Sequence, residues 1–331
     1  MLVGLLLVAS GCRRGSDDGT QAETESAGDE VCVGAGGPGV LGIDGGRFEV
    51  HLDDAAFGFS IRDCDGTVLG ETRRDGPAAF EGLAIGIVEA CDPGLFYDPK
   101  LRDGDGASLG VRWFRAAELR SGDVASGGAE LVYATRSDDG EAGPDITVRV
   151  STTTVSAVLD IEVPDDERIV FTALTMAADP DEGFHGLGQH FDRLDGRGLV
   201  REMQMQAESA SESGTNEVHV PVPFVLSTRH WGLFVADRHP AAFDLARTRE
   251  DGMRVAFFAR GFRVHLLAHH DPLTMVEHYT ELTAQPAHVP FWALGPVWWR
   301  NRNTHSDEVL SDARRARQLG FPGSLLWIDR P

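Results

Sequence analysis

The fold is decided by the stretch FWALGPVWWRNRNTHSDEVLSDARRARQLGFPGSLLWID, residues 291–329. Its two ends, FWALGPVWW (291–299) and SLLWID (324–329), are almost continuous apolar runs, which is typical of strands buried on both faces. Between them, residues 306–320 place apolar side chains at helical spacing, with acidic residues first, arginines later and a glycine at the end. This order predicts a βαβ unit with parallel strands, the repeating element of a β/α barrel.

The end of the second predicted strand carries the candidate site. In β/α barrels the carboxyl ends of the strands face the active site, and Asp329 stands at that end. A carboxylate beside an indole suits a sugar pocket, because it accepts hydrogen bonds from hydroxyls while the indole covers an apolar sugar face. The predicted substrate-binding residues are Asp329, Trp327, Trp299 and Arg300. From spacing alone, a helix cap or a salt-bridged barrel rim explains them equally well.

Upstream of this unit, the chain is built from short alternating runs separated by glycine and aspartate turns. Many closely spaced strands predict a large β-sandwich. Residues 200–218 are polar and predict a long loop, and Asp271-Pro272 marks a helix start. The runs that predict strands are RFEVHL (47–52), FGFSIRD (57–63), TVLGET (67–72), AELVYAT (129–135), ITVRVST (146–152), AVLDIEV (157–163), VPVPFVLSTRHWGLFVAD (220–237), AAFDLAR (241–247), MRVAFFA (253–259) and FRVHLLA (262–268).

The N-terminal residues MLVGLLLVASGC (1–12) predict an export signal. The apolar run is shorter than the ~20 residues that span a bilayer, and small residues precede Cys12. The pattern resembles a bacterial lipoprotein signal, in which Cys12 becomes the lipidated first residue, although Ala9 stands where leucine is usual. Residues 13–30 hold no large apolar side chain and predict a flexible linker. We therefore expect a periplasmic or cell-surface protein that touches the membrane only through this anchor.

The remaining cysteines are Cys32, Cys64 and Cys91. Outside the cytoplasm one pair of them is able to form a disulfide, and Cys64–Cys91 is the pairing predicted here. The chain has no CxxC pair, so a zinc site built on cysteine is not expected.

Charge and motifs argue against several other classes of protein. The formal net charge of −22 disfavours nucleic-acid binding, which needs lysine and arginine to neutralise phosphates. Gly186-Leu187-Gly188 lacks the third glycine of a dinucleotide-binding turn. His265, His269 and His270 are interpreted as ordinary surface histidines rather than as metal ligands. The sequence therefore predicts no metal and no cofactor.

Four segments, taken in order, resemble glycoside hydrolase family 31, the α-glucosidase family. Their order and spacing make the match specific, and it covers roughly residues 180–331. Gln189 stands where the family more usually has glutamate, which indicates a divergent subfamily. The four segments are EGFHGLGQHFDRLDGRG (182–198), VPVPFVLSTRHWGLFVAD (220–237), DPLTMVEHYTELTAQPAHVPFWALG (271–295) and GFPGSLLWID (320–329).

The resemblance implies a galactose-mutarotase-like β-sandwich followed by the first βαβ of a (β/α)8 barrel. It also implies a retaining mechanism on α-linked sugars, in which one carboxylate attacks the anomeric carbon and another protonates the leaving oxygen. In that family both carboxylates lie on later barrel strands, so the chain is expected to stop before them and to be inactive by itself. Asp329 matches the family's second-strand aspartate, which holds sugar hydroxyls and is not the nucleophile.

The predicted organisation is a signal at 1–12, a linker at 13–37, the β-sandwich at 38–285 and the start of the barrel at 286–331. Two other functions stay open. One is a non-catalytic carbohydrate-binding lipoprotein. The other is a mutarotase-like epimerase built on the sandwich alone, which needs a histidine–glutamate acid–base pair on its concave face. From about residue 287 onward we expect exposed apolar strands, because an isolated βαβ unit leaves its edges unpaired.

Overall fold

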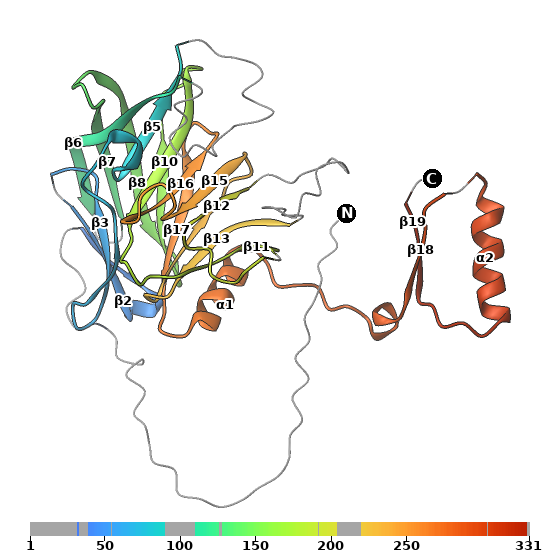
Figure 1. Ribbon diagram of the computed structural model, residues 1–331. Coiled ribbons are helices and arrows are strands. Elements are labelled where there is room, and N and C mark those ends of the chain that lie inside the picture. The colour runs from blue at the N-terminus through green and yellow to red at the C-terminus, as the bar shows by residue number, and fades with distance from the viewer. Residues whose placement is uncertain are drawn as a thin grey trace, which may run out of the picture. The chain divides into compact units, whose positions relative to one another are not determined.

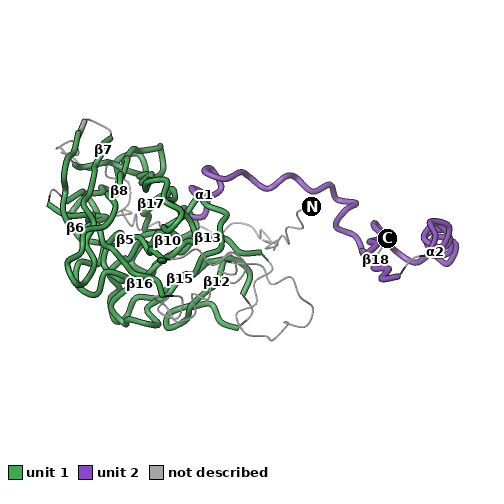
Figure 2. The backbone as a smooth tube through the Cα atoms, turned by 90° about the horizontal axis from the view of Figure 1, so that it is seen from above, with its two compact units in different colours: residues 1–275 green, residues 276–331 purple. Residues whose placement is uncertain are grey.

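The structure is a computed structural model, and it describes residue 32 and residues 39–53, 55–89, 110–125, 128–190, 192–203, 220–302 and 304–329 (Figure 1). The chain divides into two compact units, residues 1–275 and 276–331 (Figure 2). The expectations for the signal at 1–12, for Cys12, for Cys91 and for the linker apart from Cys32 fall outside the described residues. The predicted domain boundaries stay predictions. None of the helices in the described ranges is long and apolar enough to cross a membrane.

The first unit contains two antiparallel sheets (Figure 1). The smaller sheet has the order β1-β2-β3-β4 and consists of β1 (Val40–Ile43), β2 (Phe48–Leu52), β3 (Phe59–Asp63) and β4 (Val68–Glu71). The larger sheet has thirteen strands in the order β11-β13-β14-β17-β9-β8-β7-β6-β5-β10-β16-β15-β12. Its strands are β5 (Leu83–Ile87), β6 (Arg112–Ala125), β7 (Gly128–Arg136), β8 (Ala142–Thr152), β9 (Ala157–Glu162), β10 (Ile169–Ala177), β11 (Phe184–Gly188), β12 (Leu199–Glu202), β13 (Pro221–Ser227), β14 (Trp231–Val235), β15 (Ala241–Leu245), β16 (Gly252–Phe257) and β17 (Phe262–Ala268).

Alternation along the strands explains how the two sheets pack. In β2, Phe48 and Val50 are buried while Glu49 and His51 are half-buried, so one face of the strand turns inward. Apolar side chains from both sheets join a single core cluster, and each such side chain stabilises the fold by about 1.5–3 kcal/mol when fully buried. The predicted antiparallel β-sandwich is therefore confirmed. Strands β2 to β4, β7 to β9 and β13 to β17 lie in the runs that alternation indicated, whereas β1, β5, β6, β10, β11 and β12 lie outside those runs.

The opposite face of the large sheet carries a second, smaller apolar cluster. Arg254 of β16 is 2% exposed in this cluster, and its guanidinium lies over the rings of Trp113 and Phe80, 4.4 and 4.9 Å from their centroids. These cation–π contacts help to offset the cost of burying the charge. Small side chains form a row beside them, aligned in register across β5, β10, β16 and β15: Ala84, Ala173, Ala256 and Ala242.

Two glycines shape the end strand β11. Gly186 and Gly188 have φ angles of +101° and +100°, which favour glycine strongly. A Cβ atom at Gly188 would stand 2.1 Å from the carbonyl oxygen of Val220, so a side chain there is incompatible with the pairing of β11 and β13. The Gly-Leu-Gly motif therefore serves strand pairing.

The connection that follows β11 joins the two end strands of the large sheet. The N–H of Gly196 donates to the carbonyl of Phe184 at 2.8 Å, and the N–H of Gly198 donates to the carbonyl of Leu245 at 2.6 Å. The prediction of a loop beginning at residue 200 is wrong at its start, because β12 (Leu199–Glu202) pairs with β15 there. Four residues are too short for an alternation signal, and the partner strand is distant in sequence. The rest of the predicted loop, 204–218, lies outside the described residues.

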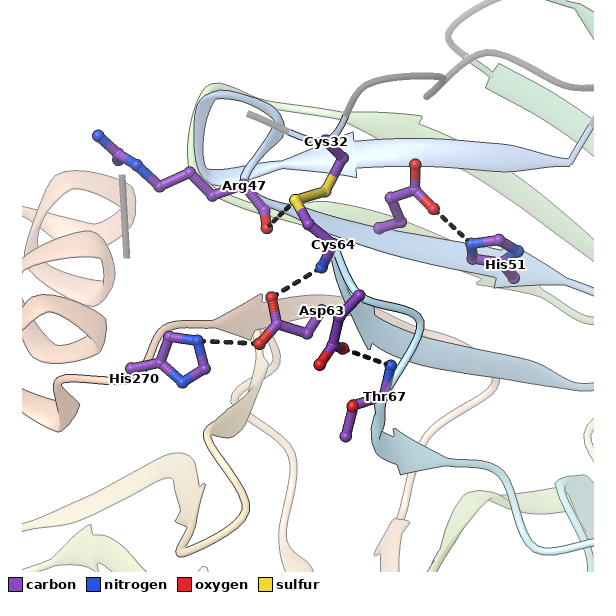
Figure 3. The surroundings of a disulfide bond; sticks show 9 residues. Cys32, Arg47, His51, Asp63, Cys64, Thr67 and His270 are labelled. Atoms are coloured by element: carbon purple, nitrogen blue, oxygen red, sulfur yellow. Dashed lines mark hydrogen bonds and ion pairs between the residues drawn. A yellow bond between two sulfur atoms is a disulfide. The ribbon is translucent and has the colours of Figure 1, made fainter. Parts of the chain in front are cut away.

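The predicted pairing of Cys64 is wrong. Cys64 forms its disulfide with Cys32, with a Cα–Cα distance of 4.8 Å (Figure 3). The bond ties residue 32 to the turn between β3 and β4, and the N–H of Cys32 also donates to the carbonyl of Gly46 at 2.8 Å. Cysteine spacing does not separate the possible pairings, because only the fold shows which Cα atoms come within bonding reach.

The second unit contains the predicted βαβ elements. They are β18 (Val297–Arg300), α2 (Ser306–Gln318) and β19 (Leu325–Ile328), and the two strands pair in parallel. Residues 291–294, predicted as strand, form the 3-10 helix η6 (Phe291–Leu294) instead, and Pro296 delays the strand to Val297. Upstream, α1 (Pro272–Thr283) begins where Asp271-Pro272 predicted, and Asp271 Oδ1 accepts the N–H of Leu273 at 2.9 Å.

Candidate functional site

The strands β18 and β19 present two different faces. Their register pairs Trp299 with Trp327 and Arg300 with Ile328. Because side chains alternate along a strand, the two tryptophans share one face, and Arg300 shares the other with Trp298. Three of the four predicted site residues belong to this strand pair, and the fourth, Asp329, follows it directly.

Helix α2 covers the face that carries Trp298. The indole N–H of Trp298 donates to the carbonyl of Pro322 at 3.0 Å, and its ring lies edge-on to Phe321. A small cavity of about 140 Å³ beside the ring is also lined by Ala313 and Ala316 of α2. This face of the strand pair is therefore the one that packs on a helix.

Arg300 is engaged by the same helix. Its guanidinium forms an ion pair of 3.1 Å with Glu308 and a second ion pair with Asp312. Hydrogen bonds from Thr304, together with Arg300, lower the pKa of Glu308, so this carboxylate stays ionised across the neutral range. The structure thus places Arg300 on the helix-covered face, away from the face of the tryptophans, and its part in substrate binding stays a prediction.

The other face of the strand pair is open and aromatic. Trp299 is 65% exposed and Trp327 is 54% exposed, and both lie on this face. The N–H of Asp329 donates to the carbonyl of Arg300 at 3.1 Å, which extends the strand ladder by one bond. Alternation then places the Asp329 side chain, which is exposed, on the face of Trp327. Strand alternation therefore groups Asp329 with Trp327 and Trp299 at the carboxyl end of the strands.

This arrangement is able to bind a polyhydroxylated ring. An ionised carboxylate accepts hydrogen bonds from two hydroxyls at once, and the flat indole faces offer apolar area to the C–H side of the ring. Nothing in this trio supplies both a nucleophile and a proton donor, so the trio alone is not a complete catalytic site.

Glu182, just before β11, is a buried carboxyl group that the sequence patterns did not single out. It is 2% exposed, and its Oε1 accepts the indole N–H of Trp231 at 2.9 Å and the hydroxyl of Ser227. Its Oε2 accepts the N–H of Asp179 at 3.0 Å. Burial raises the pKa of Glu182, although these donors act in the opposite direction. The group joins β13, β14 and the turn before β11, and no sequence pattern reveals those partners.

The three histidines considered as a possible metal set do not converge on one point. His265 is buried, and its Nδ1 lies 3.1 Å from Ser156 Oγ. His269 Nε2 lies 3.9 Å from Asp44 Oδ2, and His270 Nε2 lies 3.0 Å from Asp63 Oδ2 (Figure 3). Across the described ranges, no group of three or more histidine, cysteine or acidic side chains is arranged to hold a metal ion.

The fold defines the class of protein: a large antiparallel β-sandwich followed by a βαβ unit. Residues 95–244 match the family description "Glycosyl hydrolase 31 N-terminal galactose mutarotase-like domain". This part of the chain is therefore similar to the N-terminal, galactose-mutarotase-like domain of glycoside hydrolase family 31.

Two curated proteins are similar to this chain. An isomaltosyltransferase of Sporosarcina globispora is 24% identical over 154 residues, which cover 45% of this chain and 14% of that protein. The α-xylosidase XylQ of Lactiplantibacillus pentosus is 21% identical over 133 residues, or 40% of this chain and 17% of that protein. The matched part thus spans less than a fifth of either relative.

One solved structure shows the same fold. A family 31 sulfoquinovosidase from E. rectale, in complex with the aza-sugar inhibitor IFGSQ, superposes with a TM-score of 0.54 and 14% sequence identity. The superposition covers 84% of this chain and 40% of that one.

Proposed function

We propose that the chain is the N-terminal part of a retaining glycoside hydrolase that acts on α-linked glucosides or related sugars. One observation supports the proposal independently of the family match. Asp329 stands with Trp327 and Trp299 on the face of a parallel strand pair that is not covered by α2, at the carboxyl end of the strands. In a β/α barrel, that face and that end line the substrate site.

In this proposal the three residues hold the sugar and do not cleave it. Asp329 accepts hydrogen bonds from ring hydroxyls, and the two indoles pack against the apolar side of the ring. Retaining cleavage needs two carboxyl groups about 5–5.5 Å apart that flank the scissile bond. The acidic residues of α2 nearest to β18, Glu308 and Asp312, are paired with Arg300 on the helix-covered face. Glu308 and Asp312 are therefore not the catalytic pair of this proposal, and the resemblance to family 31 implies that the pair lies on later barrel strands.

Replacement of Asp329 tests the proposal in the product of the complete gene. Asp329→Asn should lower kcat/KM for 4-nitrophenyl α-glucoside by about 10- to 100-fold, because a hydrogen bond to a charged group contributes about 1.5–3 kcal/mol. Asp307→Asn, which changes an acid in the first turn of α2, is the matched control and should leave kcat/KM unchanged. Parent-like kinetics in Asp329→Asn would contradict the assignment of this residue to the sugar.

We also propose that the protein is exported and held at the membrane by lipid on Cys12. The Cys32–Cys64 disulfide supports export, because disulfides form and persist mainly outside the cytoplasm. The position of this bond is also suited to a tethered protein, since it fixes the chain to the sandwich twenty residues after Cys12.

A further inference from the structure

A cavity of about 320 Å³ opens in the first unit, on elements that the β18–β19 site does not use. Its charged lining residues are Asp53, after β2; Arg73 and Arg74, after β4; Glu81, before β5; and Arg115 in β6. The rest of the lining is small or apolar and includes Ala56 and Phe57. The volume lies in the range of small-molecule pockets and matches a single sugar-sized ring.

Two ion pairs flank this cavity. Arg74 Nη2 lies 2.5 Å from Asp53 Oδ2, and Arg115 Nε lies 3.3 Å from Glu81 Oε2. All four side chains keep some contact with solvent, with exposed fractions from 25% for Glu81 to 55% for Arg74. Burial raises the pKa of Glu81, although the neighbouring Arg115 acts in the opposite direction. Arg115 also forms an ion pair of 3.2 Å with Asp138.

The pairs place hydrogen-bond donors beside acceptors on two sides of one space. A guanidinium offers several N–H groups in a fork, and a carboxylate has two oxygens that accept up to about four hydrogen bonds. A ligand hydroxyl both donates and accepts, so neighbouring hydroxyls on a ring satisfy an arginine and a carboxylate together. Asp53 and Glu81 balance the charges of Arg74 and Arg115, and Arg73 is paired with Asp251, so the lining does not favour a free anion. The alanines leave the space open, and a larger side chain there would fill it.

We infer that this cavity, defined by Asp53, Arg74, Glu81 and Arg115, is an accessory binding site for a neutral, polyhydroxylated six-membered ring. It is separate from the site at Asp329 and does not depend on the proposed glycosidase activity.

Saturation-transfer NMR of the 331-residue chain tests this inference with D-glucose and myo-inositol as neutral probes and D-glucuronate as the anionic one. We expect millimolar binding of a neutral probe. Ala56→Trp, which fills the cavity, and Arg74→Ala, which removes one exposed donor, should each weaken binding by at least about tenfold. Arg120→Ala is the matched control, since Arg120 is 53% exposed and pairs with Asp145 outside the cavity.

The cavity variants are measured in the Asp329→Asn background, so that a sugar bound at the strand-pair site does not contribute to the signal. Circular dichroism and thermal unfolding check that each variant is folded. If Ala56→Trp does not fold, Arg74→Ala alone decides the test. The inference is overturned by absence of binding to the parent chain, by binding that persists in both cavity variants, or by stronger binding of glucuronate than of glucose and inositol.

Discussion

Among single residues, Glu182 shows how a carboxyl group is accommodated in the sandwich core. An unpartnered carboxylate is costly to bury, and three donors from Trp231, Ser227 and Asp179 meet this one. Burial nevertheless outweighs these donors, so the pKa of Glu182 is raised. The folded protein therefore holds this proton at pH values where the unfolded chain has released it.

Ionisation of Glu182 should make stability depend on pH. The stabilisation that comes from holding this proton is fully present below the unfolded pKa of 4.5. It is lost as the pH rises through the higher folded pKa. Glu182→Gln removes the ionisation, so the unfolding free energy of the variant relative to the parent should rise over that window. The rise should be about 1.4 kcal/mol for each unit of the shift. Urea unfolding from acid to neutral pH measures it, and a difference that stays flat would disprove the assignment.

Sequence patterns predicted the apolar core residues better than the buried polar ones. Alternation indicated that Phe48 and Val50 face inward, because a strand with one buried face repeats every two residues. Glu182 and Arg254 gave no such signal. Their burial depends on partners such as Trp231 and Trp113, which lie on strands distant in sequence.

Whole elements were predictable where they are long and regular, and their neighbours were not. Helix α2 and strands such as β2 and β8 follow the helical and alternating patterns, whereas β10 and β16 are buried along nearly their whole length and show no alternation. The order of the thirteen-stranded sheet depends on contacts such as β5 with β10 and β10 with β16, which no local pattern contains. In the candidate site, the position of Asp329 followed from strand polarity, whereas the ion pairs of Arg300 required the packing of α2.

The edge strand β11 should be especially sensitive to a methyl group at Gly188. Gly188→Ala combines a positive φ with a clash against the Val220 carbonyl and should cost at least about 3 kcal/mol of unfolding free energy. Gly198→Ala is the matched control, since Gly198 has a φ of +77° but open space around it, and should cost about 1–2 kcal/mol. Denaturant unfolding compares the two, and equal losses would argue against the close approach of β13.

Seen as a whole, the molecule combines a closely packed sandwich with a second unit that buries little. Val297 of β18 is 51% exposed and Leu325 of β19 is 45% exposed, and none of the side chains in η6 or α2 is buried. This agrees with the expectation of exposed apolar strands in an isolated βαβ unit. The first unit owes part of its stability to the disulfide, which joins Cys32 to Cys64 across a sequence separation of 32.

Removal of that disulfide should destabilise the first unit. The double variant Cys32→Ser/Cys64→Ser is expected to lose about 2–4 kcal/mol of unfolding free energy, because the cross-link restricts the unfolded chain. Parent protein in reductant should behave like the variant, while the variant itself should not respond to reductant. Peptide mapping by mass spectrometry provides the direct check, and a Cys64–Cys91 linkage would contradict the structure.

The central claim is that the sandwich and the strand pair belong to a retaining glycosidase of α-linked sugars. Proton NMR, which follows the anomer released first while the complete gene product cleaves 4-nitrophenyl α-glucoside, tests that claim most directly. The 331-residue chain serves as the control and should release no sugar. The account predicts that the α-anomer appears first and then mutarotates. Initial release of the β-anomer, or no cleavage of α-glycosides by the complete product, would contradict it.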